Sequence, residues 1–422
     1  MFSEEIGELL LAYRQRENIS LSELAERTGI SKTALYRMES GATKRPGFAQ
    51  WKKIASALNI PDVDIIAVYL STTERPTSIQ VLLNEAIALS SQALVRKAAQ
   101  KLLDSAKLDT FLALDHLHQL EKEIEDPSTK LTLHEVMIDY TRKRGIPFYL
   151  GKSLYARYLL ERNNFSRFEE TFQRGKELLH YIDLLQPLER IDYYYRMGVH
   201  AYILDYYGES IELCGKALME DRTNDSRQKA SALISVVNAY LRLGYLILAE
   251  QYLEMYEKSE YADFRKKHLR ALLHAKKGEY EQAIVLYNEC LHEAKPSERI
   301  TIASDLLDVY FETEQNGAIQ ELIATENSFL SLDSHPNRIK HAARYYKRKG
   351  MCLISMGQAD AGIDSLTQSI AFYRQIGAAA KMIEGFGTIF KYHLANRKNI
   401  SFETVENLVK ICHNSIEKEL GR

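Results

Sequence analysis

The chain has 422 residues, with 55 Lys and Arg against 57 Asp and Glu, and its formal net charge is −2. That length suits two or three ordinary domains or one long repeat array. A charge near zero excludes nucleic-acid binding through an overall positive field, so any such affinity must come from a local patch. No run of about 18 apolar residues exists, which argues against a membrane span. We therefore expect a cytoplasmic protein without a signal peptide.

Cysteine and histidine patterns point away from metal and redox chemistry. The four cysteines, Cys214, Cys290, Cys352 and Cys412, lie far apart and form no CxxC, so we expect small core residues in a reducing compartment. The chain contains no HExxH, no P-loop and no GxSxG. We expect no enzyme activity, no cofactor and no metal site.

Residues 19–41 contain the helix-start and helix-end signals of a helix-turn-helix. Ser20 and Glu23 predict a capping box at the start of the first helix. Gly29 supplies the left-handed residue that ends this helix, and Ser31 caps the next one, which stops near Gly41. Ala34, Leu35 and Met38 then share the buried side of the second helix.

The other side of this second helix is suited to DNA. The candidate DNA-binding residues are Ser31, Lys32, Thr33, Tyr36 and Arg37, with Lys44 and Arg45 in the following loop. Lys and Arg suit guanine and phosphate, Thr a thymine methyl, and Tyr a phosphate oxygen. Between residues 31 and 53 there are six basic residues against one acid. A module that only mediates dimerisation has little reason to concentrate charge in this way.

Residues 3–70 resemble the helix-turn-helix domains of the XRE/lambda-repressor family. The matching pieces are Arg14, Leu24-Ala25, Gly29-Ile30-Ser31, Met38-Glu39-Ser40-Gly41 and Ile54-Ala55-Ser56-Ala57-Leu58. The resemblance implies that Arg14 and Glu39 pair across the domain in a structural role. The family usually carries a DNA-contacting Gln where this chain has Leu21, so one expected contact is missing.

The rest of the chain predicts helices throughout, because the eight prolines fall between helical patterns and no alternating strand pattern is convincing. We expect an all-α protein with five parts. These are a DNA-binding domain over 1–70, a polar linker over 71–78, degenerate helical pairs over 79–147, a repeat domain over 148–395 and a capping helix over 396–422.

Helix–turn–helix corners recur along residues 148–395. The clearest runs over 277–287, and others lie near Gly244, Gly208, Gly357 and Asn164. Gly244 and Gly278 are 34 residues apart, which is the tetratricopeptide period. This part therefore resembles tetratricopeptide repeats, which implies a right-handed α-solenoid with small residues where paired helices cross and a cap near Phe402–Glu419.

A helical solenoid binds extended peptides on a concave face lined by the first helix of each pair. An Asn amide gives and accepts hydrogen bonds with a peptide backbone at once, which makes Asn238 the strongest candidate. For the other candidates, a solvated charge or an inter-repeat tyrosine is the simpler interpretation. Counting from the corners gives these candidate peptide-binding residues: Arg157, Tyr195, Arg196, Tyr202, Asn238, Arg242, His268, Asp308, Arg344 and Lys347, with Asp305 and Arg348 beside them.

The combination of these two parts resembles the RRNPP family of peptide-responsive quorum-sensing regulators. The resemblance implies a homodimer that binds a DNA operator, with a short signalling peptide in the groove that changes the solenoid curvature and so the spacing of the DNA-binding heads. Family members commonly hold the peptide backbone with groove asparagines. An alternative is an interaction protein whose repeat body binds a response regulator; loss of all phenotype on deleting residues 1–70 would exclude that role as an independent function.

Overall fold

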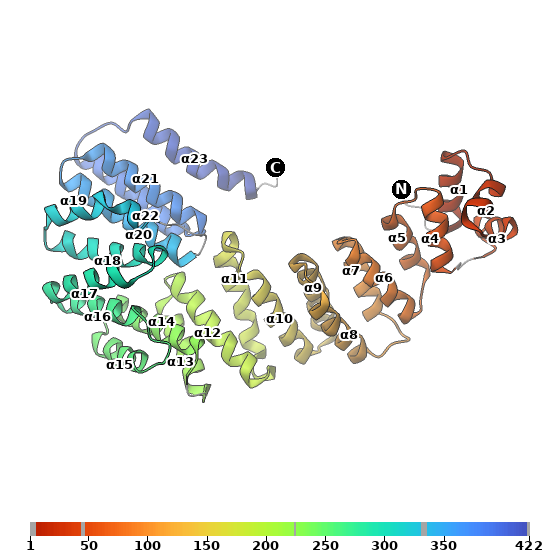
Figure 1. The fold of residues 1–422 in the computed structure, drawn as a ribbon, viewed down its shortest axis with the longest axis horizontal. Helices are drawn as coiled ribbons and strands as arrows, with labels where there is room; N and C mark the ends of the chain where they lie inside the picture. Colours follow the sequence, from red (N-terminus) through yellow and green to blue (C-terminus); the bar gives the residue numbers. More distant parts are fainter. Residues whose placement is uncertain (1–5, 44–46, 223–224, 331–335, 420–422) are drawn as a thin grey trace. The chain divides into compact units, whose positions relative to one another are not determined.

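The computed structural model describes residues 6–43, 47–222, 225–330 and 336–419, with side chains up to residue 412. Within these ranges every regular element is a helix, which confirms the expected all-α class (Figure 1). None of the described helices is long and apolar enough to cross a bilayer. The chain divides into two compact units, residues up to Leu160 (unit 1) and residues from Glu161 (unit 2).

Unit 1 begins with five short helices that are followed by longer ones. Its helices are α1 (Ile6–Arg16), α2 (Leu21–Thr28), α3 (Lys32–Glu39), α4 (Phe48–Ala57), α5 (Asp62–Thr72), α6 (Pro76–Ala88), α7 (Gln92–Leu103), α8 (Thr110–Glu123), α9 (Pro127–Arg144) and α10 (Pro147–Glu161).

Unit 2 is a series of antiparallel helix pairs. Its helices are η1 (Phe165–Arg167), α11 (Phe168–Gly175), η2 (Lys176–Leu184), α12 (Pro187–Ile203), α13 (Tyr207–Glu220), α14 (Arg227–Leu243), α15 (Leu246–Glu257), α16 (Arg265–Lys277), α17 (Tyr280–Glu293), α18 (Pro296–Glu312), α19 (Asn316–Ala324), η3 (Glu326–Ser328), α20 (Pro336–Ser355), α21 (Ala359–Gln375), α22 (Ala379–Ala395) and α23 (Phe402–Glu419).

Local sequence signals set these boundaries. A proline is the first residue of α6, α9, α10, α12, α18 and α20. Proline lacks a backbone N–H, and at this position an N–H would have no acceptor within the helix. Ser20 caps α2 and Gly29 ends it at φ 67°, as the sequence predicts. The capping box is not completed, because the Glu23 carboxylate pairs with Arg27 at 2.6 Å instead of reaching back to Ser20.

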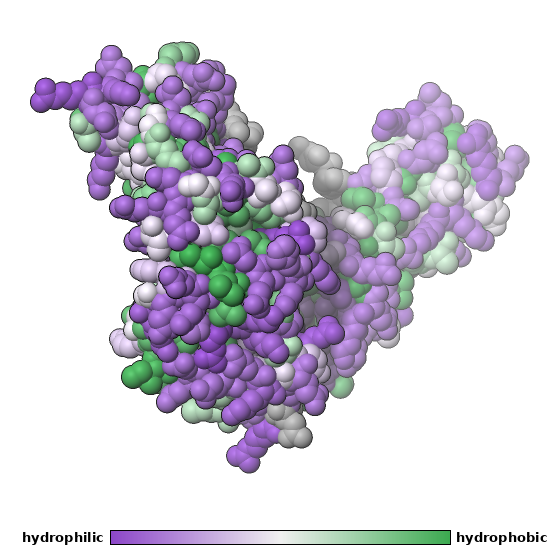
Figure 2. All heavy atoms as spheres, turned by 60° about the vertical axis from the view of Figure 1, so that its left-hand side comes forward, coloured by the Kyte–Doolittle hydropathy of each residue, from purple (hydrophilic) through white to green (hydrophobic). Residues whose placement is uncertain are grey.

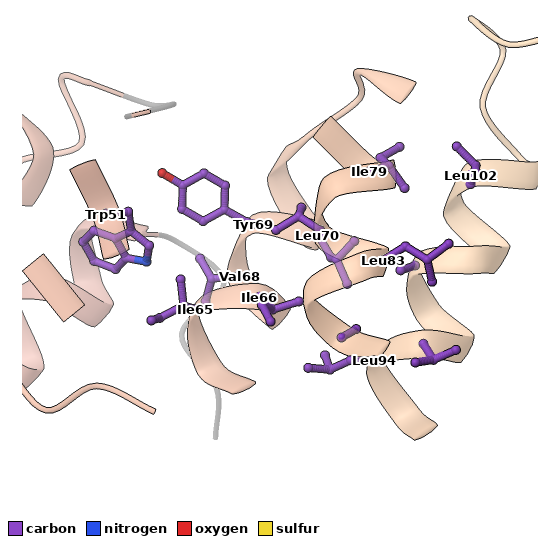
Figure 3. Packing of buried hydrophobic residues seen from close by; sticks show 14 of the residues in the cluster. Trp51, Ile65, Ile66, Val68, Tyr69, Leu70, Ile79, Leu83, Leu94 and Leu102 are labelled. Carbon is purple, nitrogen blue, oxygen red and sulfur yellow. The ribbon is translucent and has the colours of Figure 1, made fainter. Parts of the chain in front are cut away.

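The first five helices share one core with the helices that follow. Trp51 of α4 is fully buried on one side of α5, while Ile79 and Leu83 of α6 pack on its other side (Figure 3). Only residues 73–75 lie between α5 and α6, so most of the predicted linker over 71–78 is helical. Within unit 1, α5 therefore joins α1–α4 to α6 and α7 through buried side chains.

The repeat corners of unit 2 lie where the sequence predicts them. Gly244, Gly278 and Gly357 each separate two paired helices at a φ between 81° and 83°. The α12–α13 corner differs, because its left-handed residue is Asp205 at φ 66° rather than a glycine. Asp adopts the left-handed conformation more readily than most residues, so this corner forms without a glycine.

Small residues lie where paired helices cross, as expected. A Cβ added at Gly350 of α20 would stand 2.6 Å from the Gly362 carbonyl oxygen of α21, and one at Gly362 would stand 2.8 Å from the Gly350 oxygen. Cys214, Cys290 and Cys352 are buried in agreement with the sequence interpretation, whereas Cys412 of α23 is exposed. The face of the molecule shown in Figure 2 is mostly hydrophilic, with hydrophobic residues in separate groups.

Candidate DNA interface and ligand groove

One face of α3 is free of packing. Leu35 and Met38 are buried against the core, and Ser31 Oγ accepts a hydrogen bond from the Ala34 N–H at 3.3 Å. The predicted DNA-contacting residues Ser31, Lys32, Thr33, Tyr36 and Arg37 are all exposed, with Tyr36 61% exposed. An exposed tyrosine and two cations on one short helix can reach base edges and phosphates. Lys44 and Arg45 lie outside the described residues.

A partly buried ion pair holds α3 against α1. Arg14 Nη2 and Nε donate to Glu39 Oε1 at 2.6 and 3.1 Å, and Arg14 Nη1 donates to the Ile19 carbonyl at 3.0 Å. The Glu39 side chain is only 8% exposed, so the pair is largely shielded from water. This contact gives both residues the structural role that the family resemblance implies, and it fixes the orientation of α3.

Two adjoining cavities lie in unit 2 among the first helices of its repeats. The basic cavity, of about 390 Å³, is lined by Tyr202, Asp205, Tyr207, Arg242, Asp308, Lys340, His341, Arg344, Lys347, Arg348, Met351, Tyr373, Lys381 and Thr388. The Asn238 cavity, of about 330 Å³, is lined by residues of α12, α14, α16, α18 and α20. Tyr202 and His341 line both cavities, so the two adjoin there.

Asn238 occupies the wall of the second cavity. Its Nδ2 donates to the Ile234 carbonyl one turn earlier at 2.9 Å. Its Oδ1 accepts from no described residue, so the amide keeps an unused acceptor beside the cavity. Ser231, His268 and Thr301 line the same cavity and add further polar groups.

A buried carboxylate organises the region beside the two cavities. Asp305 of α18 is 3% exposed and contacts three groups: Arg344 Nη2 at 3.0 Å, His268 Nε2 at 3.0 Å and Arg242 Nη2 at 3.3 Å. Neighbouring Arg344 and the His268 hydrogen bond outweigh burial and hold the pKa of Asp305 well below its usual range. Asp305, which the sequence predicts on the same concave face, therefore holds the predicted groove residues Arg242, His268 and Arg344 in place.

Asp308 extends this network to the wall of the basic cavity. Arg348 Nε donates to Asp308 Oδ1 at 2.5 Å, and Arg344 Nη2 lies 3.4 Å from Asp308 Oδ2. Lys347 Nζ points to a different partner, Glu384 of α22, at 2.5 Å. These predicted residues, together with Tyr202 and Arg242, line the basic cavity.

Lys340 is the main groove residue that sequence reasoning missed. Its ammonium donates to Asp205 Oδ1 at 2.5 Å and to the carbonyls of Ile203 and Tyr202 at 2.9 and 3.2 Å. A signal existed, since Lys340, Arg344 and Arg348 recur every fourth residue and so share one face of α20.

Besides Asp305, three predicted groove residues line neither cavity. Tyr195 is buried and its hydroxyl donates to Asp221 at 2.8 Å. Arg196 pairs with Asp192 in its own helix at 2.5 Å. Arg157 is 7% exposed within α10, in unit 1. Tyr195 and Arg196 are therefore held by partners of their own, away from the two cavities.

Comparison with known proteins identifies the N-terminal part. Residues 10–65 match the helix-turn-helix family. The chain therefore carries an N-terminal helix-turn-helix DNA-binding domain, followed by a helical-repeat solenoid. No curated protein sequence matches it.

Two solved structures are similar at low identity. A tetratricopeptide repeat protein from Parabacteroides merdae ATCC 43184 is 14% identical with a TM-score of 0.47, and the alignment covers 71% of this chain and 98% of that one. PlcR of Bacillus thuringiensis, solved with the peptide PapR7 and DNA, is 16% identical with a TM-score of 0.22, over 91% of this chain and 99% of that one. Both TM-scores lie below 0.5, so the solenoid assignment rests on the helix pairs and corners of this chain.

Proposed function

We propose that the protein is a peptide-controlled transcriptional regulator of the RRNPP type. It binds an operator through α3 as a homodimer, and a short peptide occupies the two adjoining cavities of unit 2. The observation that carries the proposal is the pair of cavities among the first repeat helices, in a chain that also has a helix-turn-helix domain.

The shape and chemistry of the cavities favour an extended polar ligand. Each cavity has the volume of a small-molecule site, and together they form a two-part space divided at Tyr202 and His341. The unused Oδ1 of Asn238 suits a backbone N–H of such a ligand. A peptide that prefers one solenoid curvature shifts the population of conformations by its differential affinity for them.

The charge balance of the N-terminal domain favours a dimer. Residues 1–70 hold nine basic and nine acidic residues, so one copy is expected to bind DNA weakly. Two heads on two half-sites supply the missing affinity and specificity. The C-terminal helices offer an apolar surface for pairing: Ile383, Phe390 and Leu394 lie on one exposed face of α22, and Phe402, Val405 and Val409 on one exposed face of α23.

The dimer part can be tested at this surface. Leu394→Glu combined with Phe402→Glu adds charge to residues that are 78% and 84% exposed, so the subunit fold should be preserved. Light scattering should then report a halved mass relative to the unaltered chain. The exposed Ile247→Glu of α15 is the matched control and should leave the mass unchanged.

The DNA-binding part can be tested by selection from random duplexes with the full chain. Lys32→Ala combined with Arg37→Ala should abolish selection of a specific site and reduce the salt dependence of binding, because two phosphate or base contacts are lost. Lys97→Ala, an exposed cation of α7, is the matched control. Selection of the same site by the double variant, with unchanged helicity, would refute the assignment of α3.

A further inference from the structure

The basic cavity carries an excess of positive charge on its surface. Two carboxylates, Asp205 and Asp308, face six cations across it. The other acidic partners of these cations, Asp305 and Glu384, are not part of the lining. The cationic lining residues are Arg242, Lys340, Arg344, Lys347, Arg348 and Lys381.

The same cavity contains hydrogen-bond donors that the fold does not use. Tyr202 and Tyr373 are 9% and 5% exposed, and neither hydroxyl bonds to a described residue. The hydroxyl of Tyr207, in contrast, donates to Asp205 at 2.5 Å. Both residues line the cavity, so their hydroxyls are free to donate to an acceptor on a ligand.

The electrostatics of Lys340 reflect the crowding of cations around its ammonium. Burial, reinforced by neighbouring Arg344 and Arg242, lowers the pKa of Lys340 to about 8 although Asp205 opposes the shift. An additional negative charge in the cavity would offset this repulsion between cations.

We propose that the basic cavity binds a carboxylate of the ligand, with the rest of the ligand passing Tyr202 and His341 into the Asn238 cavity. This inference rests on the proposed function, because it assigns the polarity of the ligand in the same groove. The carboxylate belongs either to the C-terminus of a peptide or to an Asp or Glu side chain. Arg and Lys side chains with tyrosine hydroxyls suit either source equally.

The experiment uses the full chain and four mixtures of random heptapeptides, whose retained members are measured by ultrafiltration and mass spectrometry. The mixtures have free or amidated C-termini, each with or without Asp and Glu. We expect at least tenfold lower retention of the amidated mixture that lacks Asp and Glu. Two mixtures carry a single source of carboxylate, either a free C-terminus or Asp and Glu side chains, and the one that is retained better identifies the source. Inorganic phosphate should compete with the retained peptides.

Variants at the rim then locate the carboxylate site. Lys347 and Lys381 both pair with Glu384 and are partly exposed, so Lys347→Gln and Lys381→Gln should preserve the fold and reduce the preference for carboxylates. Lys267→Gln of α16 is the matched control, since this partly exposed lysine pairs with Glu289 and Glu293 and lines neither cavity.

The possible outcomes separate the two claims. Equal retention of all four mixtures would overturn the carboxylate assignment and leave the proposed function standing. Retention of no mixture would contradict the proposed function and the inference with it. A carboxylate preference that survives in both rim variants would place the anion elsewhere and would overturn the assignment to this cavity.

Discussion

Lys340 Nζ lies 2.5 Å from Asp205 Oδ1, across 135 residues of sequence. With the carbonyls of Ile203 and Tyr202 as further acceptors, all three protons of this ammonium have partners. The contact joins the C-terminal end of α12 to α20. It therefore links repeats that are not adjacent in the solenoid, as the Arg242–Asp305 pair between α14 and α18 also does.

Removing this contact should weaken unit 2. Lys340→Met leaves the carbonyls of Ile203 and Tyr202 without this donor and leaves the partly buried Asp205 carboxylate with only the Tyr207 hydroxyl. We expect a loss of about 1–3 kcal/mol, the cost of unsatisfied buried groups. Urea unfolding followed by circular dichroism measures the loss. Lys216→Met breaks the exposed Lys216–Glu212 pair and should cost under about 1 kcal/mol. Equal losses in the two variants would show that the contact contributes little.

The buried His200 predicts a pH dependence. Burial lowers the pKa of His200 to about 3, below the ordinary value of 6.5. The unfolded chain then binds this proton first as the pH falls, so stability is lost between pH 6.5 and 3, by at most about 1.4 kcal/mol per pH unit. His200→Gln should flatten the profile in this window, whereas the exposed His292→Gln should not. A profile that is the same in all three proteins contradicts the prediction.

The close crossing of α20 and α21 predicts sensitivity to a single methyl group. Gly350→Ala places a carbon 2.6 Å from the Gly362 carbonyl oxygen, so the helices must separate, at about 1–3 kcal/mol. Gly215→Ala is the matched control within α13, where an added Cβ meets nothing within 4 Å. That variant should be neutral or stabilised by up to about 1 kcal/mol through helix propensity. Thermal unfolding measures the stability of both variants. Equal stabilities would contradict the prediction.

Asn238 should contribute to ligand affinity more than to stability. Asn238→Ala removes the unused Oδ1 beside the cavity, and retention of the heptapeptides should fall about 2- to 10-fold, the value of one hydrogen bond. Asn396→Ala is the matched control for the loss of an Asn side chain, because Asn396 also donates to the carbonyl four residues earlier but lines neither cavity. Unchanged retention in Asn238→Ala would remove this residue from the site.

Local features of this chain were predictable from sequence, and long-range ones were not. Gly29, Gly244 and Gly278 end helices because their φ values suit glycine, which a sequence pattern records directly. The α12–α13 corner was placed near Gly208, whereas the left-handed residue is Asp205, because Asp adopts this conformation without a glycine signal.

The groove residues show the same limit. Asn238 and Arg344 line the cavities because their spacing from a corner sets the helix face. Lys340 was missed because its partners lie 135–138 residues away, a distance that no local pattern encodes. Tyr195 was assigned to the groove although its hydroxyl bonds to Asp221, which also depends on packing between helices.

The central claim is that a peptide in unit 2 controls DNA binding by unit 1. The affinity of the full chain for its selected duplex should be measured by anisotropy, with and without saturating retained heptapeptides. Emission from Trp51, the only tryptophan and fully buried in unit 1, should be recorded in the same titration. We predict at least a fivefold change in DNA affinity, the lower end of ordinary allosteric coupling, with a change in Trp51 emission. Unchanged DNA affinity at saturating peptide would contradict the account.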